Sequence, residues 1–374
     1  MKRFRIKAPS SAASRFIIFL TGMILISLIG YSFSFDSMGP MLFAIYFMFG
    51  FLLQRGTFCG AALISSVVLL KEYRGLIAIA LSILTAMLGL AVLSKIGWIT
   101  ANPRKLELLP AIVGGTLFGV GMVLAGGCIS GSLFKATELR FNSILAVIGI
   151  FIGIALIGKG PGARFRQMLS DTTNDLSIGP SLADLIGISY TKLGILVALI
   201  GIVLFIFFIR NQKRKTKSKK NTMRISLGSL SERGWSMIAV GVGIGILSWP
   251  VYFASQRLGV TYGFGAAKIP ASLLQLVIFN QVKIVGLIAW SFIVGSALSA
   301  WLRGDMIFRS ADRETLIFSF VGGLLVGSGA VIGWGCFVGN MLTGWALLSI
   351  HSLVFGITMV SANWITTIFY MRGW

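Results

Sequence analysis

The amino-acid sequence predicts an all-α polytopic membrane protein with about nine transmembrane helices, additional short re-entrant segments or half-helices, and two pseudo-symmetric halves. Composition is the first observation: of 374 residues, 56% are hydrophobic and 12% charged, and the mean hydropathy is +0.90. Soluble domains carry roughly a quarter charged residues. The second observation is the long apolar runs, such as "GILVALIGIVLFIFFI" at 194–209. A transmembrane helix needs about 17–25 mostly apolar residues, whereas strands of a membrane barrel would alternate apolar and polar residues.

Hydropathy places nine full-length apolar spans along the chain. They are 15–34, 75–97, 109–127, 142–158, 192–209, 235–254, 281–302, 315–333 and 351–370. The first span follows a basic N-terminus, as a signal peptide would, but no small-residue cleavage site follows it, so we expect a retained helix. Shorter apolar pieces, interrupted by Gly or Pro, predict half-helices or re-entrant segments. They are 41–53, 60–70, 130–137, 269–280 and 337–350.

A hydrophilic basic linker divides the chain into two halves. It covers 210–234 and separates an N-terminal transmembrane half, 1–209, from a C-terminal half, 235–374. A shift of 208 residues aligns "VGGTLFGVGMVLAGGCISG" with "VGGLLVGSGAVIGWGCFVG", and ten of the nineteen positions are identical. A weaker similarity relates "QRGTFCGAA" at 54–62 to "QRLGVTYGFGAA" at 256–267. We therefore expect two related halves about a pseudo-twofold axis, as is common in transporters.

The formal net charge of +22 arises from 33 basic and 11 acidic residues. Lys and Arg gather in the cytoplasmic loops of polytopic proteins, which accounts for this excess in one interpretation. In the other, the charge attracts an anion. Binding of nucleic acid is not expected, because the sequence contains no soluble basic domain that could hold it.

The three cysteines, Cys59, Cys128 and Cys336, each lie where a short apolar segment begins. A helix that starts inside the membrane directs unpaired N–H groups and the positive end of its dipole toward that point, which favours anions. The alternative is that each cysteine packs as a small hydrophobe. The candidate binding residues are the three cysteines and the glycines beside them, namely Gly60, Gly127, Gly131, Gly335 and Gly339.

Other cysteine chemistry fits the sequence poorly. Three thiols without a C-x-x-C pair do not indicate a structural disulfide. We expect no metal site, cofactor or catalytic triad, and hence no enzyme, since His351 is the sole histidine and is expected at the membrane interface. Thiols buried among apolar groups stay protonated, because burial disfavours the thiolate. A neutral S–H is a soft, weak donor, which suits an anion with a terminal sulfur.

The "FCG", "GGC..G" and "GWGC..GN" motifs resemble those of the YeeE/YedE membrane family, whose characterised members take up thiosulfate. The resemblance implies a two-halved, hourglass-like helical fold. It also implies that thiosulfate passes between Cys59, Cys128 and Cys336 through S–H hydrogen bonds, and that a small cytoplasmic sulfur-carrier protein of the TusA type is a partner. Some relatives are tied to selenium metabolism, so a selenium-containing anion is an alternative substrate.

Several expectations concern the rest of the pathway. Arg55 and Lys135 are candidates for its mouth, with Glu138 as a weaker one, or they anchor helix ends by snorkelling. Because Cys128 and Cys336 are equivalent in the repeat, we expect them near each other on the pseudo-symmetry axis. No acidic residue falls clearly inside a span, which favours facilitated passage.

We expect a multi-pass protein in the bilayer of the cytoplasmic membrane. Rival functions are a persulfide-forming membrane sulfurtransferase and a structural subunit of a larger permease.

The charge distribution predicts that the 210–234 linker faces the cytoplasm, because it carries the densest run of Lys and Arg. A single cysteine introduced there should resist an impermeant thiol reagent in intact cells. The same cysteine should react once the cells are permeabilised, which controls for its accessibility. Ready labelling from outside would reverse the topology.

Overall fold

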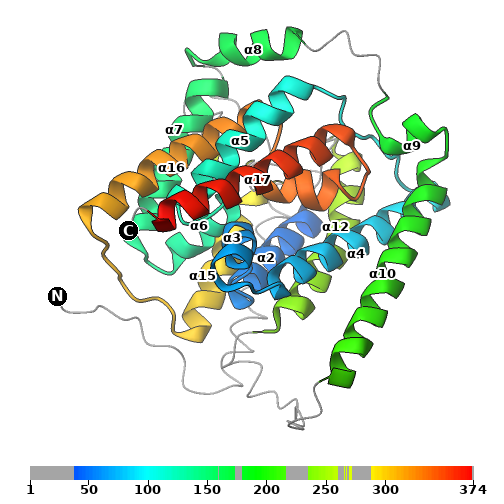
Figure 1. Cartoon of the computed structure of the whole chain (residues 1–374), viewed down its shortest axis with the longest axis horizontal. Coiled ribbons are helices and arrows are strands. Elements are labelled where there is room, and N and C mark those ends of the chain that lie inside the picture. The colour runs from blue at the N-terminus through cyan, green and yellow to red at the C-terminus, as the bar shows by residue number, and fades with distance from the viewer. Residues whose placement is uncertain are drawn as a thin grey trace.

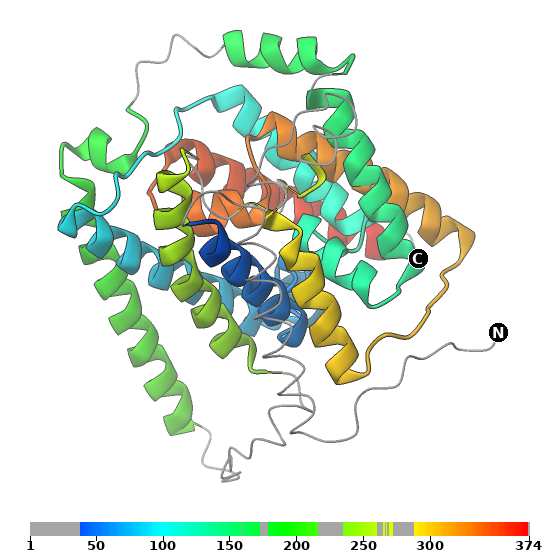
Figure 2. The same cartoon turned by 180° about the vertical axis from the view of Figure 1, so that it is seen from behind.

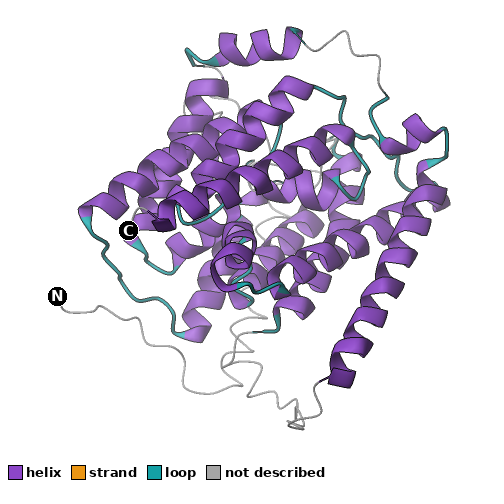
Figure 3. Ribbon diagram, in the orientation of Figure 1, coloured by secondary structure: helices purple, strands orange, loops and turns teal. Residues whose placement is uncertain are grey.

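The computed structural model describes residues 38–158, 160–172, 179–215, 235–259, 265, 267, 269–271 and 288–372. The predicted first span at 15–34, most of the short segment at 269–280 and most of the basic linker lie outside these residues. Within them the chain forms helices joined by loops, and no named strand occurs (Figure 3). The all-α prediction is confirmed for this part of the chain.

The helices are labelled in Figure 1 in chain order. They are α2 (Gly39–Arg55), α3 (Gly60–Leu70), α4 (Arg74–Ile96), α5 (Leu108–Leu124), α6 (Ile129–Thr137), α7 (Phe141–Gly158), α8 (Ala163–Asp171), α9 (Leu182–Ile186), α10 (Tyr190–Lys215), α12 (Met237–Arg257), α15 (Ser291–Arg303), α16 (Arg313–Ile332), the π-helical segment η1 (Val338–Gly344) and α17 (Ile350–Arg372).

Seven stretches among the described residues are long and apolar enough to cross a membrane, which confirms a multi-pass protein. They are α2 with α3, α4, α5 with α6, α7, α12, α16 and α17 up to Tyr370. The apolar described part of α10 and the helix α15 are shorter. The predicted short segment at 41–53 lies within α2, which has 17 residues, ends at the buried Gln54 and Arg55, and reaches spanning length only together with α3.

The sequence repeat corresponds to an antiparallel contact between α5 and α16. A β-carbon at Gly121 would lie 2.8 Å from the Gly322 carbonyl oxygen, and one at Gly329 would lie 2.7 Å from the Gly114 carbonyl oxygen. The 208-residue shift converts one contact into the other. Because equivalent helices run in opposite directions, the pseudo-twofold axis crosses them, as in inverted-topology repeats.

The remaining long helices pack in equivalent pairs. The contact of α7 with α16 is equivalent to the contact of α17 with α5. In the same way, the contact of α15 with α2 is equivalent to that of α12 with α4. A side chain at Gly327 would meet the Ile150 carbonyl, and one at Gly119 the Met359 carbonyl. Small residues let helix backbones approach closely in lipid, where no hydrophobic effect drives helices together. These glycines therefore set the spacing of the bundle.

Helices α8, α9 and α10 connect the two halves. Helix α10 packs against α4 at the side of the bundle, and α8 lies at one end (Figures 1 and 2). The predicted boundary between residues 209 and 210 falls inside α10, which continues to Lys215.

The close approach of α7 and α16 predicts that Gly327→Ala destabilises the protein, because the new methyl group would overlap the Ile150 carbonyl. Overpacking of this kind costs about 1–3 kcal/mol. Gly158→Ala is the matched control, since no atom lies within 4 Å of the position its β-carbon would take. Apparent melting temperatures in detergent should fall for Gly327→Ala alone. Equal melting temperatures for the two variants would contradict the packing role.

Candidate functional site

Helices α2, α5 and α16 end in the same tight turn. Its central residue has a left-handed backbone, with φ of +47° at Thr57, +64° at Gly126 and +56° at Trp334. The next N–H bonds to a carbonyl five residues back, at 2.9 Å for Phe58 to Leu53, 3.1 Å for Gly127 to Met122 and 2.8 Å for Gly335 to Ala330. This Schellman-type ending satisfies carbonyls that lipid could not. Two of the central residues are not glycine, so the sequence alone did not show this turn.

A cysteine follows each turn and starts the next helix. Cys59 and Cys128 have extended backbones and are the N-caps of α3 and α6, and Cys336 stands two residues before η1. Their side chains are 1%, 1% and 2% exposed. Their carbonyls accept the N–H four residues later, at 2.9 Å from Leu63, 2.7 Å from Ser132 and 2.9 Å from Asn340. The structure thus contains three copies of one arrangement, in which a left-handed turn is followed by a buried cysteine and the start of a new helix. We call each copy a break and name it by its cysteine.

Two of the thiols meet at Gly131 in α6. A β-carbon there would overlap Cys59 Sγ and lie 3.5 Å from Cys128 Sγ. The Gly131 N–H points at Cys128 Sγ at 3.4 Å, and the Ser130 hydroxyl lies 3.3 Å from the same sulfur. The absence of a side chain at Gly131 therefore allows the two thiols to lie side by side, and its role in binding stays a prediction.

The residue after the third cysteine packs against the start of α3. A side chain at Gly60 would lie 2.8 Å from the ring of Phe337, the residue after Cys336. The expectation that Cys128 and Cys336 lie near each other stays a prediction, since the antiparallel packing of α5 and α16 fixes only where the preceding turns lie. The turn at Ala125 packs beside Gly322, in the middle of α16, whereas Cys336 follows the C-terminal end of that helix. Cys59 therefore packs against Gly131 beside Cys128, and the residue after it, Gly60, packs against Phe337 beside Cys336.

The remaining predicted glycines also lie at the breaks. A β-carbon at Gly127 would be 3.0 Å from Ser132 Oγ, and one at Gly335 would be 2.9 Å from Arg104 Nη1. Gly339 is buried in the first turn of η1. Each glycine leaves room for a neighbouring polar group or helix, so packing explains these glycines as directly as binding does.

Lys135 and Arg55, the residues predicted at the mouth of the pathway, make different kinds of contact. Lys135 Nζ donates a 2.6 Å hydrogen bond to the Gly126 carbonyl, so it holds the turn that precedes Cys128. Arg55 ends α2, where its side chain is 3% exposed and its guanidinium stands 5.7 Å from the centre of the Phe51 ring. Arg55 is thus buried in the bundle, which does not match a snorkelling anchor.

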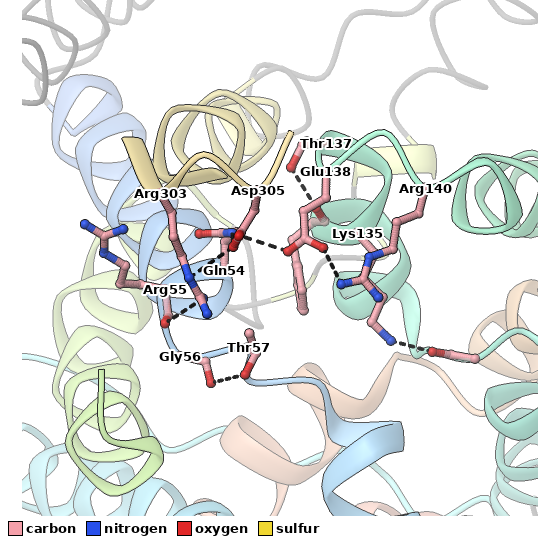
Figure 4. Close-up of polar contacts among 12 residues, drawn as sticks. Gln54, Arg55, Gly56, Thr57, Lys135, Thr137, Glu138, Arg140, Arg303 and Asp305 are labelled. Atoms are coloured by element: carbon pink, nitrogen blue, oxygen red, sulfur yellow. Dashed lines mark hydrogen bonds and ion pairs between the residues drawn. The ribbon is translucent and has the colours of Figure 1, made fainter. Parts of the chain in front are cut away.

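Glu138 belongs to a polar network between α2, α6 and α15 (Figure 4). Gln54 Nε2 donates to Glu138 Oε1 at 3.3 Å and to Asp305 Oδ2 at 3.4 Å. Arg140 pairs with Glu138 at 2.8 Å, and Arg303 with Asp305 at 3.0 Å. Opposite charges compensate within this network, which joins the two halves next to the C-terminus of α6. Gln54 and Asp305 were not predicted from the sequence. Gln54 could have been found, because a polar amide next to Arg55 at the end of an apolar segment indicates a buried polar contact.

A second network fills the break before Cys336. Asn340 Oδ1 accepts hydrogen bonds from Arg104 Nη1 at 2.8 Å and Ser352 Oγ at 3.0 Å. Its Nδ2 donates to the Gly333 and Gly335 carbonyls at 3.2 and 3.1 Å. The side chain of Asn340 is fully used, and it ties the turn to Arg104. Arg104 was not selected from the sequence, because it lies far from the cysteine motif along the chain.

Helix α8 closes over the same turn. Glu107 Oε2 accepts hydrogen bonds from Trp334 Nε1 and Ser170 Oγ, both at 2.8 Å, and the Arg166 guanidinium stacks 4.1 Å from the centre of the Trp334 ring. Burial there lowers the pKa of Arg166 from its usual value, and the nearby Glu107 carboxylate opposes that shift. His351 is buried, not interfacial: its Nδ1 accepts from the Glu107 N–H at 3.4 Å, and its Nε2 lies 3.3 Å from the Gly333 carbonyl.

The site is therefore a set of neutral donors, and the charged side chains nearby, such as Lys135 and Arg104, are already engaged by other groups of the protein. All three cysteines are free thiols. Among the described residues, no group of three or more His, Cys, Asp or Glu side chains could hold a metal ion. The arrangement can offer S–H groups and helix N-termini to an anion that has lost its water.

Comparison with known proteins agrees with this chemistry. Residues 55–365 match a family model described as sulphur transport. The thiosulfate transporter TsuA of Escherichia coli K12 is 27% identical over 327 residues, which cover 85% of this chain and 90% of that protein. The thiosulfate transporter TsuA of Spirochaeta thermophila is 26% identical over 330 residues, which cover 85% and 94%. The match includes all three cysteine breaks, and the resemblance to the YeeE/YedE family is confirmed: the chain belongs to the sulphur transport family of membrane proteins.

Proposed function

We propose that this protein takes up thiosulfate, or a related sulfur-containing anion, along a pathway formed by Cys59, Cys128 and Cys336. The observation that carries the proposal is that each cysteine of the chain is buried at the start of a helix that begins inside the bundle. The names of the two relatives support thiosulfate as the substrate.

The physical problem for such a protein is to replace the water around an anion without trapping it. An S–H group donates a weak hydrogen bond and adds no positive charge, so it helps an anion without binding it tightly. The N-termini of α3 and α6 add partial positive charge at Cys59 and Cys128. Since Cys59 Sγ packs against Gly131 and the adjacent Gly60 packs against Phe337, we assign Cys59 the middle step of the proposed pathway.

The proposal includes a location and a partner. We place the protein in the cytoplasmic membrane, where the basic linker faces the cytoplasm and a TusA-like sulfur-carrier protein receives the sulfur. The support for this partner is the family resemblance of the cysteine motifs. Removal of the anion by downstream chemistry would then draw further anion inward.

The alternatives make different chemical demands. A sulfurtransferase would form a covalent persulfide on one cysteine, which mass spectrometry after exposure to substrate would detect. Transport of a selenium-containing anion would appear as preferential competition by that anion. Uptake by the purified chain alone in liposomes would exclude a purely structural subunit.

Replacing single cysteines tests the pathway. Cys59→Ala, Cys128→Ala and Cys336→Ala each remove one S–H donor from a desolvated anion, at a cost of about 1.5–3 kcal/mol. Uptake of labelled thiosulfate into proteoliposomes should fall roughly ten- to a hundredfold, since about 1.4 kcal/mol is tenfold in rate. Ser82→Ala is the control, because its buried hydroxyl bonds only within its own helix, to the Ile79 carbonyl. Wild-type uptake by all three well-folded cysteine variants would rule out the pathway.

The choice of anion tests the role of soft donors. Thiosulfate carries a terminal sulfur, whereas sulfate has the same charge but only hard, strongly hydrated oxygens. Unlabelled thiosulfate should therefore inhibit uptake at concentrations at least roughly tenfold lower than sulfate does, if one charge-assisted hydrogen bond is at stake. Equal inhibition by the two anions would mean that charge and size alone decide.

A further inference from the structure

The three breaks carry different side chains at the fourth residue after the cysteine. Its N–H bonds to the cysteine carbonyl in every copy, so its side chain leaves the first turn of the new helix at an equivalent place. The residue is Leu63 after Cys59, Ser132 after Cys128 and Asn340 after Cys336. Ser132 and Asn340 are also related by the 208-residue shift of the repeat, so a direct comparison between them is valid.

Both polar side chains turn back toward the glycine before the cysteine. Ser132 Oγ would lie 3.0 Å from a β-carbon on Gly127, and Asn340 Nδ2 would lie 3.3 Å from one on Gly335. Asn340 uses this position to bind two backbone carbonyls and to accept from Arg104 and Ser352. The Cys336 break is therefore filled by polar groups of the protein itself.

At the Cys128 break the equivalent group has nothing to bind. Ser132 is 1% exposed, and its Oγ has no hydrogen-bond partner in the part of the chain that the structure describes. Burying a hydroxyl without a partner is unfavourable, because it has lost its bonds to water. The nearby Ser130 hydroxyl is already beside Cys128 Sγ. Ser132 is thus an available donor in the first turn of a nine-residue helix whose positive end favours anions.

We propose that the Ser132 hydroxyl binds an oxygen atom of the transported anion when the anion stands at Cys128. This inference rests on the proposed transport function and assigns the anion an orientation: its sulfur faces the thiols, and an oxygen faces Ser132. Cys128 then recognises the terminal sulfur, and Ser132 recognises the oxyanion part that thiosulfate shares with sulfate.

The test compares thermal stability with and without thiosulfate in detergent. A ligand that binds the folded state raises the melting temperature by mass action. Ser132→Ala removes an unpartnered hydroxyl, so without anion it should melt at or above the wild-type temperature, whereas loss of a structural hydrogen bond would lower it. The rise produced by thiosulfate should be clearly smaller than in the wild type. Ser248→Ala, whose hydroxyl bonds to the Ile244 carbonyl of its own helix, is the control.

Uptake kinetics provide the second measurement. Ser132→Ala should raise KM for thiosulfate roughly tenfold, the effect of one hydrogen bond to an anion. It should weaken inhibition by sulfate to the same degree, so the preference for thiosulfate over sulfate stays, whereas Cys128→Ala should reduce that preference. A wild-type KM and a wild-type thermal shift in Ser132→Ala, with impaired cysteine variants, would overturn the role of Ser132 alone. Unimpaired cysteine variants would overturn the transport pathway itself.

Discussion

The antiparallel contact between α5 and α16 determines where the other parts of the site lie. Gly121 and Gly329 allow these two backbones to touch, and in lipid such close packing replaces the hydrophobic effect as the source of helix association. Because the helices run in opposite directions, the turns that end them stand at opposite ends of the pair. The turn before Cys128 thus lies beside the middle of α16 and the turn before Cys336 beside Gly114 in α5, while the start of α3 packs against Gly131 and Phe337.

A second constraint acts at the breaks themselves. Backbone groups inside a membrane need partners within the protein, so a helix can end there only in a turn that satisfies its carbonyls. The left-handed residues Thr57, Gly126 and Trp334 make the same turn three times and place a cysteine after it each time. The repeated backbone explains how thiols with few polar neighbours in sequence come to stand at helix N-termini.

The two breaks related by the repeat have diverged in what fills them. Asn340 and Arg104 occupy the break at Cys336, and α8 covers its turn through Trp334. At the Cys128 break, Lys135 holds the turn through a hydrogen bond to the Gly126 carbonyl. The Ser132 hydroxyl has no hydrogen-bond partner among the described residues. Two equivalent turns of one repeat therefore carry different polar groups: within the described part of the chain, the turn before Cys336 is filled by the side chains of the protein itself, and the turn before Cys128 is not.

The sequence by itself determined the all-α membrane class, the inverted repeat and the three cysteines, because hydropathy and glycine spacing are local properties that a repeat displays twice. It did not determine that α2 continues through the buried Arg55, nor that His351 is buried beside Gly333, because the partners of both residues come from distant segments. The networks around Gln54 and Arg104 were hidden for the same reason. Only the tertiary structure decided which cysteines are neighbours: Cys59 and Cys128 lie far apart in sequence, and the packing of the start of α3 against α6 brings both thiols to Gly131, which has no side chain to keep them apart.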